Sequence, residues 1–482
     1  MGSGLGDGIR FAALPLLAAS LTRSPLLVAA VATAEGLPWL LISPLSGVLI
    51  DRHDRRRVMR SAAEVRVGLM AALIAIVLTH VISIWWLCGI GFFLGCADTF
   101  SSISSLGLLP ALVQPSQLER ANAVSQGLSS VGANLLGPAI GGLFFAVAVI
   151  LPFSLDMTAF VVVILLLTGL RGQFRAVATP GASPATGIKA ELWEGMTWLW
   201  RHRVLRSLAL LTGAMNLAFG MMLGILVLFV LETLHLPRPA YGLLLATFAV
   251  GGLLGTATAV RYGPQVRSAL TLRLVLLTQG IGAGAISWWP GLAAVIPAFL
   301  AIGFVSTMWD VVVISYRHHV VPDALLGRVT GAFRFIGMGA TPAGTLLGGL
   351  IAGFFGLRAP FAAAAVILLL ATWQPCWCWK AIHWRWPTKL PPEGRRPRAR
   401  RCASRAFFGG NQRTALATSC GWVDFGQSAA IRANPPLPAS GVASLLLDFG
   451  SRRLWGEFGN FSHVRVPLCQ EVFRPARSGR LG

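Results

Sequence analysis

Five ionisable residues stand inside stretches of sequence that are otherwise almost entirely apolar. They are Asp7, Arg10, Glu35, Asp98 and Asp310. If these stretches cross a membrane, each charge at the bilayer centre costs on the order of 2.5–3.5 kcal/mol, so it must face a partner or a water-filled cavity. Desolvation favours the protonated form of a carboxyl group, which suits such a group to proton exchange near neutral pH. We therefore predict that these residues take part in proton coupling or substrate binding.

Plainer interpretations stay open for some of these charges. Asp7 and Arg10 are three residues apart and share a helix face, where they could form only a structural pair. Asp310 could lie near a membrane interface. Asp156 falls near the outer end of its predicted segment, so we interpret it as structural.

The composition indicates that these stretches do lie in a membrane. Of the 482 residues, 55% are hydrophobic and only 12% are charged, whereas a soluble domain carries roughly 25% charged residues. The net charge of +22 could suggest a nucleic-acid partner. Most of the arginines, however, lie in short gaps between apolar stretches or in the C-terminal region, and with three tyrosines no aromatic platform for bases is present. This distribution favours basic cytoplasmic loops and excludes nucleic-acid binding.

Twelve stretches approach the length of about 20 apolar residues that a spanning helix needs. They cover residues 3–21, 25–49, 61–80, 83–110, 121–147, 149–170, 204–231, 240–262, 268–287, 289–316, 325–354 and 358–373. We predict an N-terminal six-helix bundle (1–171), a cytoplasmic linker with an amphipathic helix (172–203) and a C-terminal six-helix bundle (204–373). The basic residues fall almost entirely in alternate loops, so the N-terminus is predicted to be cytoplasmic.

The two predicted halves repeat each other. A shift of 207 residues superposes Val113 on Val320, Pro115 on Pro322 and Leu118 on Leu325. The same shift places the glycines of residues 132–143 on those of residues 339–350. Two parallel repeats of six helices are typical of a large class of secondary transporters. The expected fold is therefore an all-α membrane protein with twelve transmembrane helices in two pseudo-twofold bundles.

Both ends of the chain depart from this pattern. The first segment begins almost at Met1, which leaves open a start further upstream. Residues 374–482 combine Trp, Cys and Arg without a hydrophobic period. Two interpretations of this basic tail stay open: a disordered segment, or the product of a shift in reading frame near residue 373.

A dense charge cluster, GVLIDRHDRRRVMR at residues 47–60, joins the second and third predicted helices. Gly47 permits close helix approach, and Asp51 can accept hydrogen bonds at a helix end. The residues that follow, Arg52, Arg55 and Arg56, hold the loop in the cytoplasm or pair with aspartates. A purely topogenic basic loop is the alternative, but it would need neither the glycine nor the aspartate.

This loop resembles the signature G-x-x-x-D-R-x-G-R-R of the major facilitator superfamily, with Asp54 in the place of the usual glycine. Its D-R-x-D-R-R-R form, with LGDGI (5–9) and ELWEGMTWLWRHRVLRSL (191–208), is similar to the enterobactin-exporter and macrolide-efflux branch. The resemblance covers residues 5–372. It implies that the loop locks an inward gate against the eleventh helix, where Arg328 is a candidate partner of Asp51.

The fifth predicted helix carries GPAIGG, with Gly137, Pro138, Gly141 and Gly142. Pro138 removes a backbone hydrogen bond, and the glycines let neighbouring helices approach. The stretch resembles the antiporter motif of exporters in the same superfamily. Ordinary close packing is the alternative interpretation.

Signals of an enzyme are absent from the sequence. No nucleophile elbow and no phosphate-binding loop occurs, so ATP-driven export is not expected. The Cys376-Trp-Cys378 stretch has the wrong spacing for a zinc site, and we predict no metal and no cofactor.

We therefore expect a secondary active exporter in the bacterial inner membrane, acting as a monomer. It would exchange protons for an amphipathic small molecule such as a drug, macrolide or siderophore. Two alternatives stay open: a lysophospholipid or metabolite carrier of the same fold, or a non-transporting or defective membrane protein.

Overall fold

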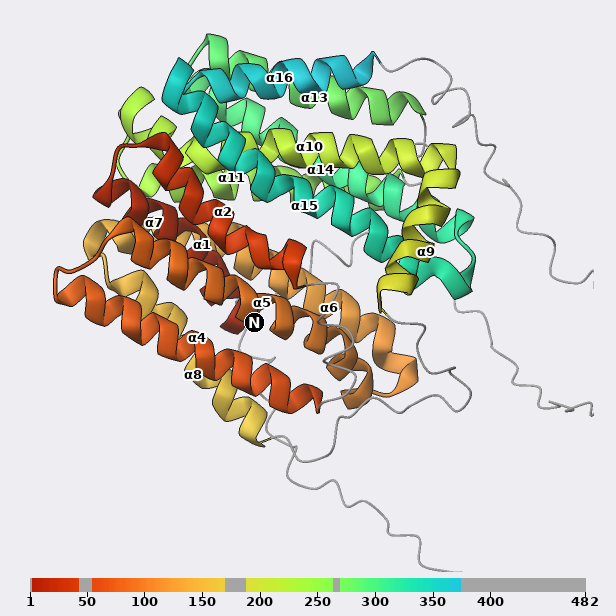
Figure 1. Ribbon diagram of the computed structural model, residues 1–482, viewed down its shortest axis with the longest axis horizontal. Helices are drawn as coiled ribbons and strands as arrows, with labels where there is room; N and C mark the ends of the chain where they lie inside the picture. Colours follow the sequence, from red (N-terminus) through yellow and green to blue (C-terminus); the bar gives the residue numbers. More distant parts are fainter. Residues whose placement is uncertain (1, 43–53, 170–187, 263–268, 374–482) are drawn as a thin grey trace, which may run out of the picture. The chain divides into compact units, whose positions relative to one another are not determined.

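The computed structural model describes residues 2–42, 54–169, 188–262 and 269–373, and these residues form helices joined by short connections (Figure 1). Within these ranges no β-strand occurs, which confirms the predicted all-α fold. The predicted tail, residues 374–482, lies outside the described residues.

The N-terminal half runs from α1 to α8. Its elements are α1 (Gly2–Leu21), α2 (Pro25–Leu41), α4 (Arg55–Leu78), α5 (Ile84–Leu112), the 3-10 turn η1 (Pro115–Gln117), α6 (Leu118–Ser130), the π-helical segment η2 (Val131–Leu136), α7 (Gly137–Val147) and α8 (Leu151–Gly169). The linker contains α9 (Ile188–Arg201).

The C-terminal half runs from α10 to α16. Its elements are α10 (Arg203–Leu228), the π-helical segment η3 (Phe229–Thr233), α11 (Pro239–Arg261), α13 (Ala269–Trp288), α14 (Leu292–Val320), α15 (Asp323–Phe355) and α16 (Ala359–Thr372).

Ten helical stretches in the described part of the chain are long and apolar enough to cross a membrane. Two shorter apolar helices, Pro25–Leu41 and Ala359–Thr372, accompany them. Together they correspond one to one to the twelve predicted segments, although the second and twelfth are shorter than a full span in the described residues. The helices α6, η2 and α7 form the single stretch Arg120–Val147.

The predicted irregularity at Pro138 takes the form of a π-helical turn. Pro138 has no backbone N–H, and in a regular helix its ring would collide with the carbonyl four residues earlier. The chain widens into η2 immediately before Gly137 and resumes the α-helical form in α7. A single π-turn of this kind is a common response to a local disruption of helical hydrogen bonding.

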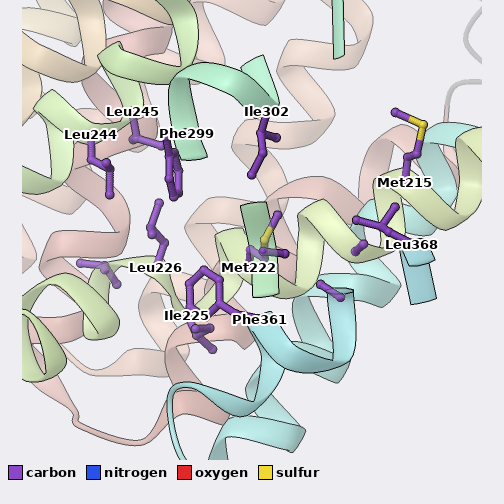
Figure 2. Packing of buried hydrophobic residues seen from close by; sticks show 14 of the residues in the cluster. Met215, Met222, Ile225, Leu226, Leu244, Leu245, Phe299, Ile302, Phe361 and Leu368 are labelled. Carbon is purple, nitrogen blue, oxygen red and sulfur yellow. The ribbon is translucent and has the colours of Figure 1, made fainter. Parts of the chain in front are cut away.

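The C-terminal bundle has a continuous apolar core. Figure 2 shows Met222 and Ile225 of α10, Phe299 and Ile302 of α14, and Phe361 of α16 within it. The rings of Phe229 and Phe361 pack with centroids 4.6 Å apart. This core joins helices that are far apart in sequence and fixes the bundle as one packed unit.

Equivalent glycines form equivalent contacts in the two halves. A Cβ at Gly137 would lie 2.5 Å from the Cα of Gly8 in α1, and one at Gly141 would lie 3.0 Å from the Cα of Ile9. In the other half, a Cβ at Gly344 would lie 3.0 Å from the Cα of Leu217 in α10. The first helix of each bundle thus packs directly on a glycine face of the fifth, as the sequence repeat predicts.

The bundles meet through α2 with α15 and through α7 with α11. A Cβ at Gly142 would lie 3.2 Å from the Cα of Gly242 in α11. One at Gly349 would lie 3.0 Å from the carbonyl oxygen of Pro25 in α2. Since Pro25 starts α2 and Gly349 is near the end of α15, the bundles are in close contact at the end opposite the basic loops. The repeated pair Gly142 and Gly349 therefore joins the bundles to each other.

These glycine contacts predict the effect of G137A. The new methyl group would overlap the α1 backbone at Gly8, so G137A should lower the free energy of unfolding by about 1–3 kcal/mol, as overpacking does elsewhere. Thermal unfolding of the detergent-purified protein measures this. The matched control is G68A, because a Cβ at Gly68 in α4 has no neighbour within 4 Å. Equal effects of the two substitutions would contradict the close packing of α1 on α7.

Candidate functional site

Four of the five predicted intramembrane charges come together in one cluster. Arg10 of α1 pairs through Nη1 with Oε1 of Glu35 in α2. Its Nη2 donates to Oδ2 of Asp98 in α5 at 2.7 Å. Arg10 is almost wholly buried, so these two carboxylates supply the counter-charge that its burial requires.

A second buried arginine, Arg66 of α4, completes the cluster and was not among the predicted site residues. Its Nη1 pairs with Oδ1 of Asp98, and its Nη2 donates to Oδ1 of Asp7 at 2.5 Å. The guanidinium carbon also lies 3.6 Å from the centre of the Phe160 ring. Arg66 therefore joins α1, α4, α5 and α8. The sequence does contain a signal for Arg66, because it is the one arginine inside the predicted apolar segment 61–80.

The structure adds Asp156 to this group of charges, while its interpretation as a structural residue stays a prediction. Asp156 lies at the level of Arg66, with its Oδ1 3.7 Å from Arg66 Nη2. Its side chain is completely buried, and neither carboxyl oxygen has a hydrogen-bond partner in the described residues. Asp156 is a member of the charge cluster, which therefore contains Asp7, Arg10, Glu35, Arg66, Asp98 and Asp156.

Asp310 does not join this cluster. It lies in α14 of the C-terminal bundle, and its side chain is exposed. The buried polar contacts described in that bundle include neutral ones: Trp309 Nε1 donates to Thr212 Oγ1 at 2.9 Å, and Gln279 Nε2 donates to Ser306 Oγ at 3.0 Å. The role of Asp310 in coupling stays a prediction without support from the cluster.

A cavity of about 720 Å³ borders the cluster. The N-terminal bundle contributes Asp7, Arg66 and Asp98 to its wall, and α15 of the C-terminal bundle contributes Arg334 and Phe335. Polar lining residues include Ser101, Ser102, Ser105, Gln126, Ser129 and Thr330, and apolar ones include Trp39, Leu40, Met59, Phe160 and Met338. The cavity thus lies between the bundles, at the ends of the helices that the basic loops connect.

The predicted gating loop is only partly described. Gly47, Asp51 and Arg52 lie outside the described residues. Asp54 caps α4 by accepting a hydrogen bond from the backbone N–H of Arg56 at 2.9 Å. The side chain of Arg56 donates to the carbonyl oxygens of Leu167 and Thr168 at 2.6 and 2.9 Å, which fastens α4 to the C-terminal end of α8.

The other predicted gate residues lie at the ends of α4 and α15. Arg55 begins α4. Arg328 pairs with Glu194 of α9, and a Cβ at Gly195 would lie 3.1 Å from the Cβ of Arg328. The linker helix is thereby held against α15. Among the described residues no group of His, Cys, Asp and Glu could hold a metal ion.

Solved structures of membrane transporters share this arrangement of helices. A bacterial homologue of the iron transporter ferroportin, in an inward-facing state, matches with a TM-score of 0.62 at 17% identity, over 80% of this chain and 96% of that one. A bacterial homologue of the lysosomal transporter Spinster, inward-facing and unoccupied, matches with a TM-score of 0.56 at 14% identity, over 80% and 96%. At such low sequence identities, the similarity shows that this chain shares the fold of these transporters and nothing further.

Sequence comparison gives the family. The chain belongs to the transmembrane secretion effector family (MFS_3), which matches residues 1–378. The multidrug efflux pump Tap of Mycolicibacterium fortuitum is 27% identical over 76% of this chain and 91% of that protein. The enterobactin exporter EntS of Shigella boydii serotype 4 is 24% identical over 71% and 81%. The protein is therefore a multi-pass membrane transporter and not an enzyme, and the predicted superfamily and branch are confirmed.

The charge cluster predicts the effect of R66M. Removing the shared cation leaves Asp7 and Asp98 without one counter-charge, so the free energy of unfolding should fall by about 3–5 kcal/mol at neutral pH. Protonation of the carboxylates relieves their repulsion, so the loss should shrink as the pH is lowered. Thermal unfolding across a pH series measures both effects.

The control is R60M, because Arg60 forms an exposed pair with Glu64 one helical turn away in the same helix. Such a pair contributes only about 0.3–0.5 kcal/mol. If R66M is no less stable than R60M, Arg66 is not the shared counter-ion of the cluster.

Proposed function

We propose that this protein is a secondary active exporter that exchanges protons for an amphipathic small molecule. The observation that carries the proposal is the buried charge cluster on the wall of a cavity between the two bundles. The cluster supplies groups that can bind protons, and the cavity supplies space for a substrate beside them.

The charge balance of the cluster supports proton binding. Four carboxyl groups face two guanidinium groups, and Arg10, Arg66 and Asp156 are nearly or fully buried. A buried carboxylate without a full counter-charge is unfavourable, so protonation is the least costly way to balance the surplus. Uptake and release of a proton therefore change the charge and the pairing of groups on five helices, which is the property that a coupled transporter needs.

The chemistry of the cavity supports an amphipathic substrate. Its volume of about 720 Å³ lies within the usual range for small-molecule sites. Trp39, Phe160 and Phe335 offer aromatic surface, while serines and Gln126 offer hydrogen bonds. Relatives named as a multidrug efflux pump and an enterobactin exporter are consistent with export of such molecules. A lysophospholipid or metabolite would also be amphipathic and stays the alternative substrate.

The arrangement of the bundles supports alternating access. The bundles touch at the end opposite the basic loops, and the cavity lies toward the loops. If the basic loops are cytoplasmic, as the positive-inside rule predicts, this is an inward-facing state. We propose that the protein acts as a monomer in the bacterial inner membrane, with its N-terminus in the cytoplasm.

Proton coupling is tested by efflux from proteoliposomes with an imposed proton gradient. One proton moving through 100 mV provides about 2.3 kcal/mol, which supports a substrate gradient of roughly fifty-fold. We expect D98N and E35Q to reduce proton-driven efflux of dyes and macrolides at least about tenfold, because each removes an ionisable partner of Arg10. The readout is the steady-state substrate gradient.

The control for these two variants is E64Q, which makes the same chemical change on the exposed face of α4. Size-exclusion profiles and unfolding temperatures of all variants separate loss of coupling from loss of folding. Unchanged gradients in both D98N and E35Q would remove these residues from the coupling mechanism.

We also propose that the loop with Gly47, Asp51, Arg52, Arg55 and Arg56 acts as a gate with Arg328, as its resemblance to the superfamily signature implies. Arg328 already forms an ion pair with the carboxylate of Glu194, so its guanidinium group is accessible to a carboxylate at this end of α15. Asp51 would compete for the same guanidinium in another state of the cycle.

The gate predicts that D51A slows substrate turnover at least about tenfold, as loss of a charged interaction present in only one state of the cycle should do. Membrane insertion and unfolding temperature should stay unchanged. Initial rates of efflux measure the effect, with E64Q as the exposed-carboxylate control. Normal turnover of D51A would contradict a gating role for this loop.

A further inference from the structure

We propose that Asp7 and Asp156 share one proton, and that Arg66 pairs with whichever of the two is ionised. The inference rests on the proton-coupled transport proposed above and assigns the proton carrier within it. It gives Asp156, which has no hydrogen bond here, a role as the sealed proton-holding partner of Asp7, with Arg66 as the positioning residue.

One nitrogen atom serves both carboxyl groups. Arg66 Nη2 lies 2.5 Å from Oδ1 of Asp7 and 3.7 Å from Oδ1 of Asp156. The other terminal nitrogen, Nη1, is already paired with Asp98. Asp7 and Asp156 therefore share the positive charge of one guanidinium group, and in this state its hydrogen bond goes to Asp7.

Asp156 is placed to carry the proton in this state. Its side chain has no solvent exposure, and neither oxygen has a hydrogen-bond partner among the described residues. The backbone of α1 lies directly against Asp156, because a Cβ atom at Gly6 would overlap the Oδ1 atom of Asp156. An ionised carboxylate so enclosed would lack both water and hydrogen bonds, so the neutral form is the stable one.

Among the described residues, Arg66 is the cation nearest to Asp156. The charged residues that act on it are Arg66 of α4, Arg10 and Asp7 of α1, and Asp98 of α5. Arg10 is committed to Glu35 and Asp98. The helix α7, which also packs against α8, contains no ionisable side chain. Arg66 is thus the cation that can stabilise an ionised Asp156.

Asp7 connects this sealed site to the cavity. Its side chain is 38% exposed and lines the cavity wall, whereas that of Asp156 is 0% exposed. Because both Oδ1 atoms approach the same nitrogen, the two carboxyl groups lie within about two hydrogen-bond lengths of each other, which suits proton transfer through a bridging water molecule. Asp7 is therefore the point at which a proton can enter from the cavity or leave to it.

The exchange conserves charge. The O–H bond on Asp156 breaks and an O–H bond forms on Asp7, while Arg66 Nη2 moves from Asp7 to Asp156. The guanidinium keeps its pair with Asp98 and its stacking on Phe160 throughout. Asp7 then gives the proton to water in the cavity, and the reverse sequence loads Asp156. Each transfer therefore moves the hydrogen bond of Arg66 between Asp7 of α1 and Asp156 of α8.

The test compares D156N, D7N and E64Q with the unmodified protein in proteoliposomes. Two quantities are measured: substrate accumulation driven by a proton gradient, and substrate–substrate counterflow without a gradient. We expect D156N and D7N to lose most of the roughly fifty-fold gradient that one proton per 100 mV supports, while counterflow persists. The exposed-face control E64Q should keep both activities.

A second measurement does not depend on transport. In the infrared spectrum of the unmodified protein at neutral pH, we expect the carbonyl band of a protonated carboxyl group. D156N should remove this band, and D7N should retain it. Absence of the band from the unmodified protein would overturn the proposal even if D156N failed to insert into the membrane.

The outcomes separate this inference from the proposed function. If the unmodified protein shows counterflow but no proton-driven accumulation, proton coupling itself is wrong. If the unmodified protein is coupled and D156N remains equally coupled, only the shared proton of Asp7 and Asp156 is overturned, and Asp156 is a neutral structural group.

Discussion

The N-terminal bundle depends on two arginines, Arg10 and Arg66, that are almost wholly buried and paired with carboxylates. Arg66 is 2% exposed and joins Asp7, Asp98 and the ring of Phe160, so it holds α1, α5 and α8 around α4. Breaking a buried ion pair by removing one partner is far more costly than never having formed it, because a bare charge remains. The positions of these helices are therefore tied to the state of charge of the carboxyl groups, which a proton can change.

The two bundles share their backbone packing but differ in their chemistry. Gly137 and Gly344 pack against the first helix of their own bundle. Gly142 and Gly349 pack against a helix of the opposite bundle. The contacts described in the C-terminal bundle at Trp309 and Gln279 are neutral. The repeat thus supplies a shared frame of glycine contacts, and divergence within that frame places the described charge cluster in the N-terminal half.

Hydrophobic length, the position of charges and the repeat were enough to predict the twelve segments and four members of the cluster, while the family came from the resemblance of the loop at residues 47–60 to the superfamily signature. Asp7, Arg10, Glu35 and Asp98 stand out because each is a lone charge in an apolar run. Arg66 was missed because it follows the basic run from Arg55 to Arg60 and reads as its continuation. Asp156 was placed by depth alone, and depth cannot tell which helix face meets Arg66. Asp310 met the same criterion as the others, yet its face of α14 is exposed.

The helix α2 connects the charge cluster to the contact between bundles. Glu35 is held by Arg10, while two residues earlier Thr33 Oγ1 lies 2.7 Å from Thr345 Oγ1 of α15. One residue after Glu35, a Cβ at Gly36 would lie 3.1 Å from Pro342 Cγ. Neighbouring residues of one rigid helix thus face a titratable site and the opposite bundle. A change in the pairing of Glu35 would act on the same helix that contacts α15, because both sets of contacts lie within one turn of α2.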